Sequence, residues 1–260
     1  MKNLSAALYL EFFKTKKSKI FWSTIVVFSI IPLFMGIMMF IARNPEIGKK
    51  LGLIGMKANM FGDNDWKGYF SLLTQVIASI GLIGFGFVNA WVFGSEHTDK
   101  TMKDLLALPV RRSTIVFAKT LIASAWSILL AFVLFVVGVS LGFAMDLPSW
   151  SNESFLQFTY RFFVCAILTL ALSSPVSYLA GYSHGIIAPL GFVIFSMIMA
   201  QFVALIGIGP YFPWAIPGLF SVGNDSPGMQ LSFASYIILF STFSVAYYLT
   251  VYWWEKADHH

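Results

Sequence analysis

The sequence is poor in charged residues and has a single cysteine. Asp, Glu, Lys and Arg make up 11% of its 260 residues, whereas 58% are hydrophobic and 17% are aromatic. So little polar surface cannot cover a soluble protein of this size, and lipid must replace water around much of the chain. The lone Cys165 cannot form an internal disulfide, and no neighbouring His or Lys activates its thiol. We therefore predict an integral membrane protein without cysteine chemistry.

Several motifs that carry chemistry are also missing. The sequence lacks the Gly-x-x-x-x-Gly-Lys-[Ser/Thr] loop that holds ATP phosphates, so ATP hydrolysis cannot be assigned to this chain. It lacks His-Glu-x-x-His, paired intramembrane aspartates and Cys/His clusters, which disfavours membrane proteases and metal sites. The net charge of +5 is divided among short clusters, which suit membrane topology better than nucleic-acid binding. We expect no catalytic residue, metal or cofactor in this chain.

Six hydrophobic runs are each long enough to cross a bilayer, which takes about 20 helical residues. The predicted spans cover about 20–41, 69–93, 116–145, 161–181, 185–208 and 229–254. No charged residue occurs between Arg161 and Asp225, so the fourth and fifth spans are divided at the glycines of 181–185. The sequence thus predicts an all-α protein with one transmembrane domain over residues 1–260.

The basic residues are distributed unevenly over the predicted loops. An even number of spans places both termini on one side, and that side carries eleven of the Lys and Arg residues against six on the other. Basic residues concentrate in cytoplasmic loops, which favours a multi-pass protein with both termini in the cytoplasm.

A short amphipathic segment precedes the first span. Leu4, Leu8 and Phe12 recur every four residues, and a cluster of lysines follows them. This pattern predicts a helix over about 3–18 that lies along the membrane surface. A disordered basic segment is the alternative.

The connection between the second and third spans holds the most informative pattern. Thr101 and Asp104 fit a capping box, and Pro109 ends the helix at Leu108. This predicted helix has about two turns and cannot cross a bilayer. Its apolar residues share one face: Met102, Leu105 and Leu106. Such a face favours docking on the membrane or in a groove of a partner protein.

A series of motifs follows one order along the chain. A span ending in Phe-Gly precedes a Glu, a Thr, the run Leu-Leu-Ala-Leu-Pro, a basic pair and a later Lys. These positions are Phe93, Gly94, Glu96, Thr101, 105–109, Arg111, Arg112 and Lys119. The order resembles the ABC-2 type permeases, the membrane subunits of type V ABC exporters, and especially bacitracin- and lantibiotic-type export and immunity permeases. Segments 11–22 and 207–217 are similar to the interfacial elbow helix and last extracellular connection of that family.

The resemblance implies partners for this chain. The short helix over 101–108 would be a coupling helix that docks into an ATPase subunit. The coupling residues implied in this way are Glu96, Thr101, Met102, Lys103, Asp104, Leu105, Leu106, Leu108, Arg111 and Arg112. Two ATPase copies, which bind ATP and Mg, would serve a pair of permease chains, expected to be a homodimer. The location would be a prokaryotic plasma membrane.

A hydrophobic or amphipathic substrate is expected, such as a peptide antibiotic, a peptide toxin or a lipid-like compound, because the spans lack central charges. Gln75, Asn89 and Gln201 are the candidate pathway residues, although polar residues in spans often only join helices. The proline-rich segment 207–221 should dip into the outer leaflet. Its aromatic residues are candidates for an extracellular gate: Tyr211, Phe212 and Trp214.

Two other functions remain alternatives for this sequence. An ATP-independent channel or assembly factor would use the short cytoplasmic helix only against lipid. A membrane hydrolase would use Ser183 and His184, which lie in a Gly-x-Ser-x-Gly pattern. That pattern marks a nucleophile only on a strand-to-helix turn with an acid nearby, whereas here it joins two apolar helices. A plain helix-to-helix turn is therefore the favoured interpretation.

Overall fold

The computed structural model describes residues 2–43, 65–98, 110–223 and 230–256, and within them all regular structure is helical. Six spans are long and apolar enough to cross a membrane in this part of the chain. They are α2 (Lys19–Arg43), α4 (Trp66–Thr98), α6 (Arg112–Ala144), α7 (Asn152–Leu172) with α8 (Ser174–Tyr182), α9 (Ile187–Leu205) and α11 (Phe233–Lys256). The predicted all-α membrane fold with six spans is therefore confirmed.

Two helices are longer than the spans drawn from hydrophobicity. Helix α4 continues to Thr98, so that the segment after Phe93, expected as a loop, is helical. Helix α7 begins at Asn152, well before 161. Glu153 lies in its first turn, where a negative charge suits the helix dipole. Arg161 is exposed, and such a long side chain can lie along a helix while its charge reaches the interface.

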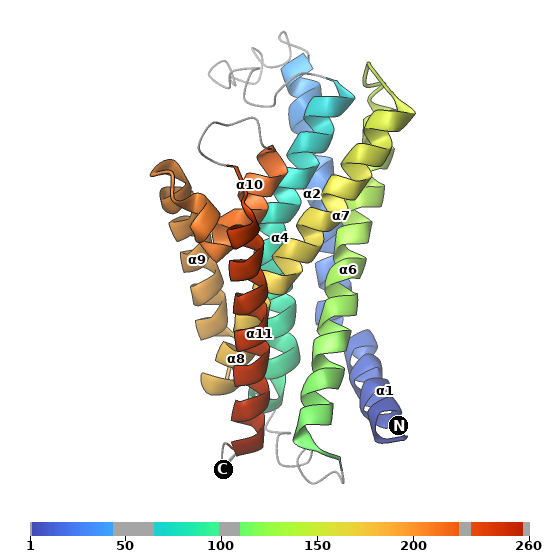
Figure 1. Ribbon diagram of the computed structural model, residues 1–260. Coiled ribbons are helices and arrows are strands. Elements are labelled where there is room, and N and C mark those ends of the chain that lie inside the picture. The colour runs from blue at the N-terminus through green and yellow to red at the C-terminus, as the bar shows by residue number, and fades with distance from the viewer. Residues whose placement is uncertain (1, 44–64, 99–109, 224–229, 257–260) are drawn as a thin grey trace.

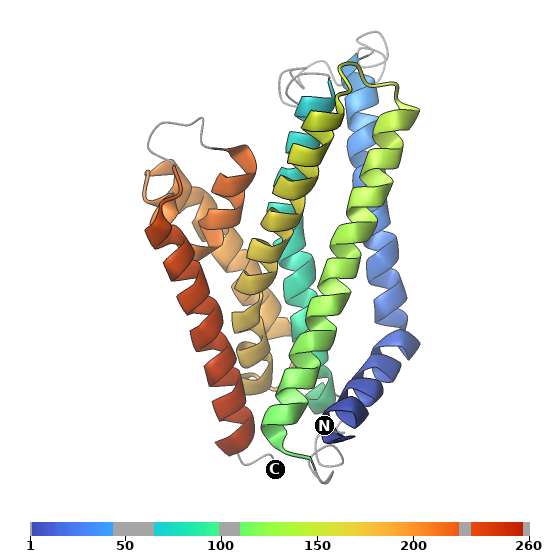
Figure 2. The ribbon, with the colours of Figure 1, turned by 45° about the vertical axis from the view of Figure 1, so that its right-hand side comes forward.

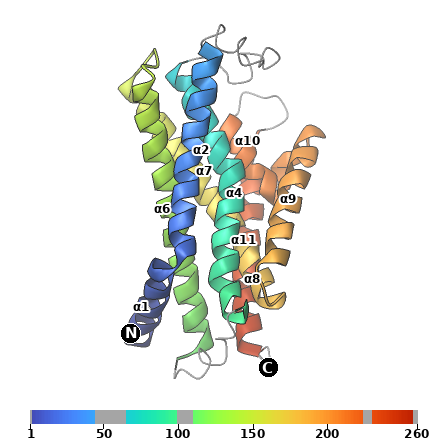
Figure 3. The ribbon, with the colours of Figure 1, turned by 180° about the vertical axis from the view of Figure 1, so that it is seen from behind.

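Helix α4 is the centre of the bundle. It packs against α6, α7, α8 and α9, whereas α2 packs mainly on α6. The start of α1 (Lys2–Lys17), the end of α4, the start of α6 and the end of α11 all lie at one end of the molecule, called the terminal end below (Figure 1). The opposite end is called the distal end. Helix α1 runs at an angle to α2 and contacts the first turns of α6 (Figures 1 and 3).

Close packing of α4 on α6 depends on small residues. Gly142 lies against the Trp66 ring, and a Cβ added there would be 2.5 Å from two ring carbons. Tyr69 donates a hydrogen bond of 2.9 Å to the Gly138 carbonyl. Because lipid is as apolar as the side chains, such packing and hydrogen bonding, rather than exclusion from water, holds spans together. The glycines of α6 therefore serve a contact within this chain.

The fourth span is broken at Ser173, between α7 and α8. Pro175 has no backbone N–H, so the carbonyl of Ala171 loses its usual donor. The Ser174 hydroxyl donates to that carbonyl at 2.7 Å, and the Ser173 hydroxyl donates to the Leu170 carbonyl at 2.6 Å. The two serines thus satisfy backbone groups that lipid cannot.

The chain folds back into the bundle after α9. Two 3-10 turns, η2 (Gly209–Tyr211) and η3 (Pro213–Ala215), lead into the short α10 (Ile216–Val222), which packs against α4 and α7. Figure 3 shows α10 beside the upper half of α4. The expected irregular segment is present, and it lies against protein because unpaired backbone groups are costly in lipid.

Candidate functional site

Four charged side chains meet at the terminal end, where α1, α4 and α6 converge. They are named the charge cluster: Glu11, Lys14, Glu96 and Lys119. The Lys119 side chain is completely buried, and its Nζ lies 2.7 Å from Glu96 Oε1 and 2.9 Å from Glu11 Oε1. It also donates to the Val92 carbonyl at 3.0 Å. A buried ammonium needs such a full set of partners, because its desolvation is expensive.

Lys14 attaches α1 to the end of α4. Its Nζ lies 2.7 Å from Glu96 Oε1, donates to Ser95 Oγ at 2.9 Å, and sits 5.4 Å from the centre of the Trp91 ring. With two carboxylates and two ammonium groups, the charge cluster is neutral overall. Neutrality and mutual contact make the burial tolerable and hold α1, α4 and α6 in one arrangement.

Glu96, one of the predicted coupling residues, belongs to the charge cluster. The resemblance implies a coupling role for Glu96, which stays a prediction, and the residue is only 3% exposed in this chain. It is buried because α1 and α6 bring Lys14 and Lys119 to its carboxylate. The sequence contained one usable signal, since Glu96 and Lys119 are opposite charges near the facing ends of consecutive antiparallel helices. The contributions of Glu11 and Lys14 depend on where α1 docks and were missed.

The remaining predicted coupling residues differ in what the structure shows of them. Thr101, Met102, Lys103, Asp104, Leu105, Leu106 and Leu108 lie outside the described residues. Arg111 precedes α6 and is exposed. Arg112 binds the end of α11 through its Nη1, which donates to the carbonyls of Trp254 at 3.1 Å and Glu255 at 3.3 Å. A cation there also complements the helix dipole of α11.

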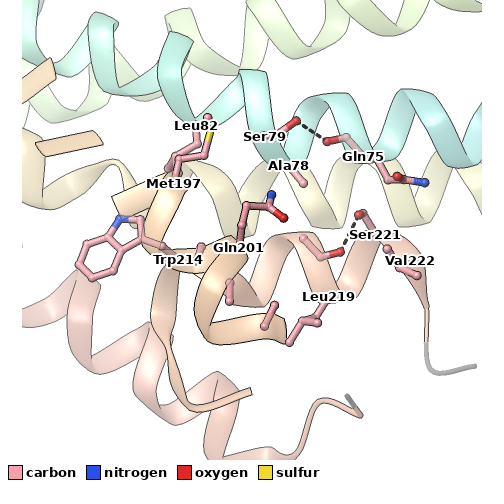
Figure 4. Close-up of a pocket in the computed structure, with 14 residues that line it drawn as sticks. Gln75, Ala78, Ser79, Leu82, Met197, Gln201, Trp214, Leu219, Ser221 and Val222 are labelled. Carbon is pink, nitrogen blue, oxygen red and sulfur yellow. Dashed lines mark hydrogen bonds between the residues drawn. The ribbon is translucent and has the colours of Figure 1, made fainter. Parts of the chain in front are cut away.

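A cavity of about 300 Å³ lies between α4, α9, η3 and α10, and is named the distal cavity. Two predicted pathway residues, Gln75 and Gln201, line it together with the predicted gate residue Trp214 (Figure 4). The Gln75 amide donates to Ser71 Oγ at 3.2 Å, which leaves its oxygen available to a guest. Gln201 is exposed on α9. Amides offer both donors and acceptors, so the cavity can bind uncharged polar groups beside apolar ones.

Asn89 lies elsewhere and has a different environment. Its amide nitrogen donates to the Phe85 carbonyl at 2.9 Å and to Ser173 Oγ at 2.8 Å, and its oxygen accepts from Ser177 Oγ at 2.8 Å. The bonds to Ser173 and Ser177 join α4 to the break between α7 and α8. The amide therefore joins helices, the alternative weighed for polar residues in spans.

The three candidate gate residues also differ in their surroundings. Trp214 packs against Phe192, with ring centres 5.4 Å apart, and against Phe212 at 5.6 Å. Tyr211 is 63% exposed. Only Trp214 of the three lines the distal cavity, and a gating role for all of them stays a prediction.

Ser183 and His184 form the turn between α8 and α9, and both side chains are exposed. The His184 ring lies edge-on to His97, with ring centres 4.7 Å apart. Gly185 presses its carbonyl against Gly94 of α4, where a Cβ would come within 2.8 Å of that oxygen. The segment therefore packs α4 against a helix-to-helix turn, and it lacks the strand that a Gly-x-Ser-x-Gly nucleophile requires.

Known proteins are similar to this chain over most of its length. Residues 7–201 match the family described as ABC-2 family transporter protein. The chain is also 20% identical over 185 residues to the bacitracin transport permease protein BCRB of Bacillus licheniformis, which covers 71% of this chain and 88% of that protein. The matched segment runs from α1 into α9 and includes the whole charge cluster. With six apolar spans and this match, the chain belongs to the ABC-2 transporter family and is a multi-pass permease subunit of an ABC transporter.

Proposed function

We propose that this chain is the permease of an ATP-driven exporter for a hydrophobic or amphipathic substrate. A separate ATPase subunit would dock on the connection that holds 101–108. The charge cluster carries this proposal, because it ties together the two helices that the connection joins, α4 and α6, and adds α1. Both termini would then face the cytoplasm, where ATP is available, in a prokaryotic plasma membrane.

The clamped helices give a mechanical route from the ATPase to the distal cavity. A push on the connection moves α4 and α6 together, since Glu96 and Lys119 hold their ends at 2.7 Å. Gln75 lies on the same continuous α4 as Glu96. At about 1.5 Å per residue, a displacement at one residue is carried about 30 Å along the helix to the other. Closure of the ATPase would in this way reshape the cavity between α4, α9 and α10.

The lining of the distal cavity favours the kind of substrate proposed. Gln75, Ser79 and Gln201 are uncharged hydrogen-bonding groups, and Leu82, Met197 and Trp214 are apolar. Such a mixture fits a peptide antibiotic, a peptide toxin or a lipid-like compound, and the similar protein is named for bacitracin transport. A second copy of this chain would complete the membrane part, and two ATPase subunits carrying ATP and Mg would complete the exporter.

The docking of the ATPase is tested by purification. The chain is extracted gently from native membranes, and bound ATP-hydrolysing protein is measured for the wild type and for Leu105→Asp. We expect a stoichiometric ATPase subunit with the wild type and its loss with Leu105→Asp, because a charge disrupts an apolar docking face.

The matched control is Leu53→Asp, which makes the same change in the connection between α2 and α4. Both variants should insert equally, and Leu53→Asp should retain the ATPase. Purification of the wild type without any ATPase would contradict the proposal, as would equal retention by both variants.

The substrate is tested by export from cells that produce the complex. Retention of a fluorescent amphipathic peptide should fall relative to cells with the Leu105→Asp variant, and the difference should vanish when ATP is depleted. Equal peptide retention in both kinds of cell, although the wild-type chain still binds its ATPase, would contradict export of this class of substrate. It would not contradict the proposed ATPase contact.

A further inference from the structure

A second cavity, named the lateral cleft, touches α4 at Asn89, nearer the terminal end than the distal cavity. It has a volume of about 390 Å³ and is walled by α6 and α11, with the break between α7 and α8 as its floor. Its lining includes Ser124 of α6, Ala171 and Ser174 at the break, and Phe243 of α11. This volume is within the range of about 300–1,000 Å³ that small-molecule sites usually have.

The two walls are joined at the terminal end and diverge above it. Arg112 at the start of α6 binds the carbonyls at the end of α11, and Lys119 lies 5.9 Å from the Trp254 ring centre. Toward the distal end α6 and α11 move apart (Figure 2). The lateral cleft begins directly above this junction, since Thr120 and Thr250 line it.

Most polar side chains that line the lateral cleft donate their hydrogen bonds to other groups of the protein. The Ser173 and Ser174 hydroxyls donate to backbone carbonyls, as do those of Thr120 and Thr250, at 2.6–2.9 Å. Ser177 and Asn89 bond each other. The polar groups of the floor therefore have hydrogen-bond partners within the protein, and a bound molecule need not supply any. The lining has no charged side chain to compensate the desolvation of an ion or a highly polar molecule. A hydrocarbon chain needs no such partner, so its binding there carries no desolvation cost of this kind.

The mouth of the lateral cleft is apolar and lies within the spans. Ile167 of α7 and Phe240 of α11 flank it with 58% and 69% of their surfaces exposed. Farther in, Phe243 and Tyr247 present stacked rings with centres 6.4 Å apart. Residues exposed at this depth face the bilayer, so the molecules that reach the mouth first are lipid chains.

We propose that the lateral cleft binds a hydrocarbon chain of a bilayer lipid. The chain fills the space between α6 and α11 and supports their separation above the Arg112 junction. Because α6 also carries Lys119 of the charge cluster, the bound chain supports a helix that is fixed at the terminal end. The inference does not depend on the transported substrate.

Photolabelling of the full-length chain tests this site. The chain is placed in phosphatidylcholine–phosphatidylglycerol vesicles containing a phospholipid with a diazirine in one acyl chain, irradiated, and mapped by mass spectrometry. We expect labelling of Leu170, Ala171 and Phe243 several-fold above that of Phe132 and Phe195, which are exposed residues outside the cleft.

Matched variants on α6 show whether the label enters the cleft. Ser124→Phe fills it and should lower the labelling of Ala171 and Phe243 several-fold. Ala125→Phe adds the same ring at the next residue, which is exposed and outside the lining, and should leave the labelling unchanged. Ala171→Leu fills the cleft from its floor and serves if Ser124→Phe folds poorly.

Two results would overturn the proposal. One is labelling at the cleft no higher than at Phe132 and Phe195, the result expected if a helix of a second copy occupies the space. The other is labelling that persists unchanged in well-folded Ser124→Phe and Ala171→Leu.

Discussion

The charge cluster brings four ionised side chains into contact at the terminal end, whereas the distal cavity leaves two uncharged amides facing open space. The cluster joins three regular helices. The cavity is bounded on one side by the 3-10 turn η3 and a helix of seven residues, α10. The two regions share α4, so that a rigid junction and a loosely bounded cavity lie on one helix.

The difference assigns mechanical roles to the two ends. Strong, directional charge pairs in a dry environment permit few alternative arrangements. Neutral amides and short irregular segments can change partners at small cost, as segments that move in transport must. We therefore expect substitutions at the charge cluster to affect stability and coupling together, and substitutions in the distal cavity to affect transport alone.

The largest effect is expected from Lys119→Met. It removes the only buried cation of the charge cluster within the described residues and leaves the carboxylate of Glu11 buried without its partner. Breaking a buried pair in this way costs about 3–5 kcal/mol. We expect a loss of that size in the free energy of unfolding, measured by denaturant titration in mixed micelles.

Lys16→Met is the control, since it removes an exposed lysine of α1. It should change stability by less than about 1 kcal/mol. Adding Glu11→Gln to Lys119→Met should restore part of the loss, because the buried negative charge is then gone. Equal stability of Lys119→Met and Lys16→Met would mean that the charge cluster does not hold the terminal end together.

A smaller loss is expected from Gly94→Ala, which separates the terminal end of α4 from the α8–α9 turn. The new Cβ would lie 2.8 Å from the Gly185 carbonyl oxygen, a backbone atom that cannot rotate away. Overpacking of this kind costs about 1–3 kcal/mol. The same titration would measure it.

Gly191→Ala on α9 is the matched control, since nothing lies within 4 Å of its added Cβ. It should be neutral or stabilise by about 0.5–1 kcal/mol, because alanine is the better helix former. If both alanines were equally tolerated, the close approach of α4 to the turn would not constrain the structure.

Sequence reasoning predicted the parts of this structure that depend on local composition. The spans follow from unbroken hydrophobic runs. Gln75 and Gln201 are rare amides within these spans, and this made them candidate pathway residues. Asn89 was indistinguishable from these two, because its partners Ser173 and Ser177 are brought near only by the fold. The burial of Glu96 likewise depends on where α1 docks, which no local pattern specifies.

An intermediate effect distinguishes Asn89 from the cavity amides. Asn89→Leu removes two hydrogen bonds between α4 and the α7–α8 break and one within α4, and leaves the Ser177 hydroxyl without its acceptor. Hydrogen bonds between membrane helices contribute about 0.6 kcal/mol each, so the loss should be about 1–2 kcal/mol. Stability equal to that of wild type would place Asn89 with the pathway residues instead.

The smallest effect on stability is expected from Gln201→Leu. Its side chain is exposed, and no hydrogen bond joins its amide to another described residue. Replacing it should change the free energy of unfolding by less than about 0.5 kcal/mol, as for other exposed positions. Export of an amphipathic peptide should nevertheless fall, because the distal cavity loses one of its two amides, while ATPase binding is retained. Export at the wild-type rate in Gln201→Leu and in Gln75→Leu would move the substrate pathway away from the distal cavity, and a large loss of stability would show that these amides, like Asn89, hold helices together.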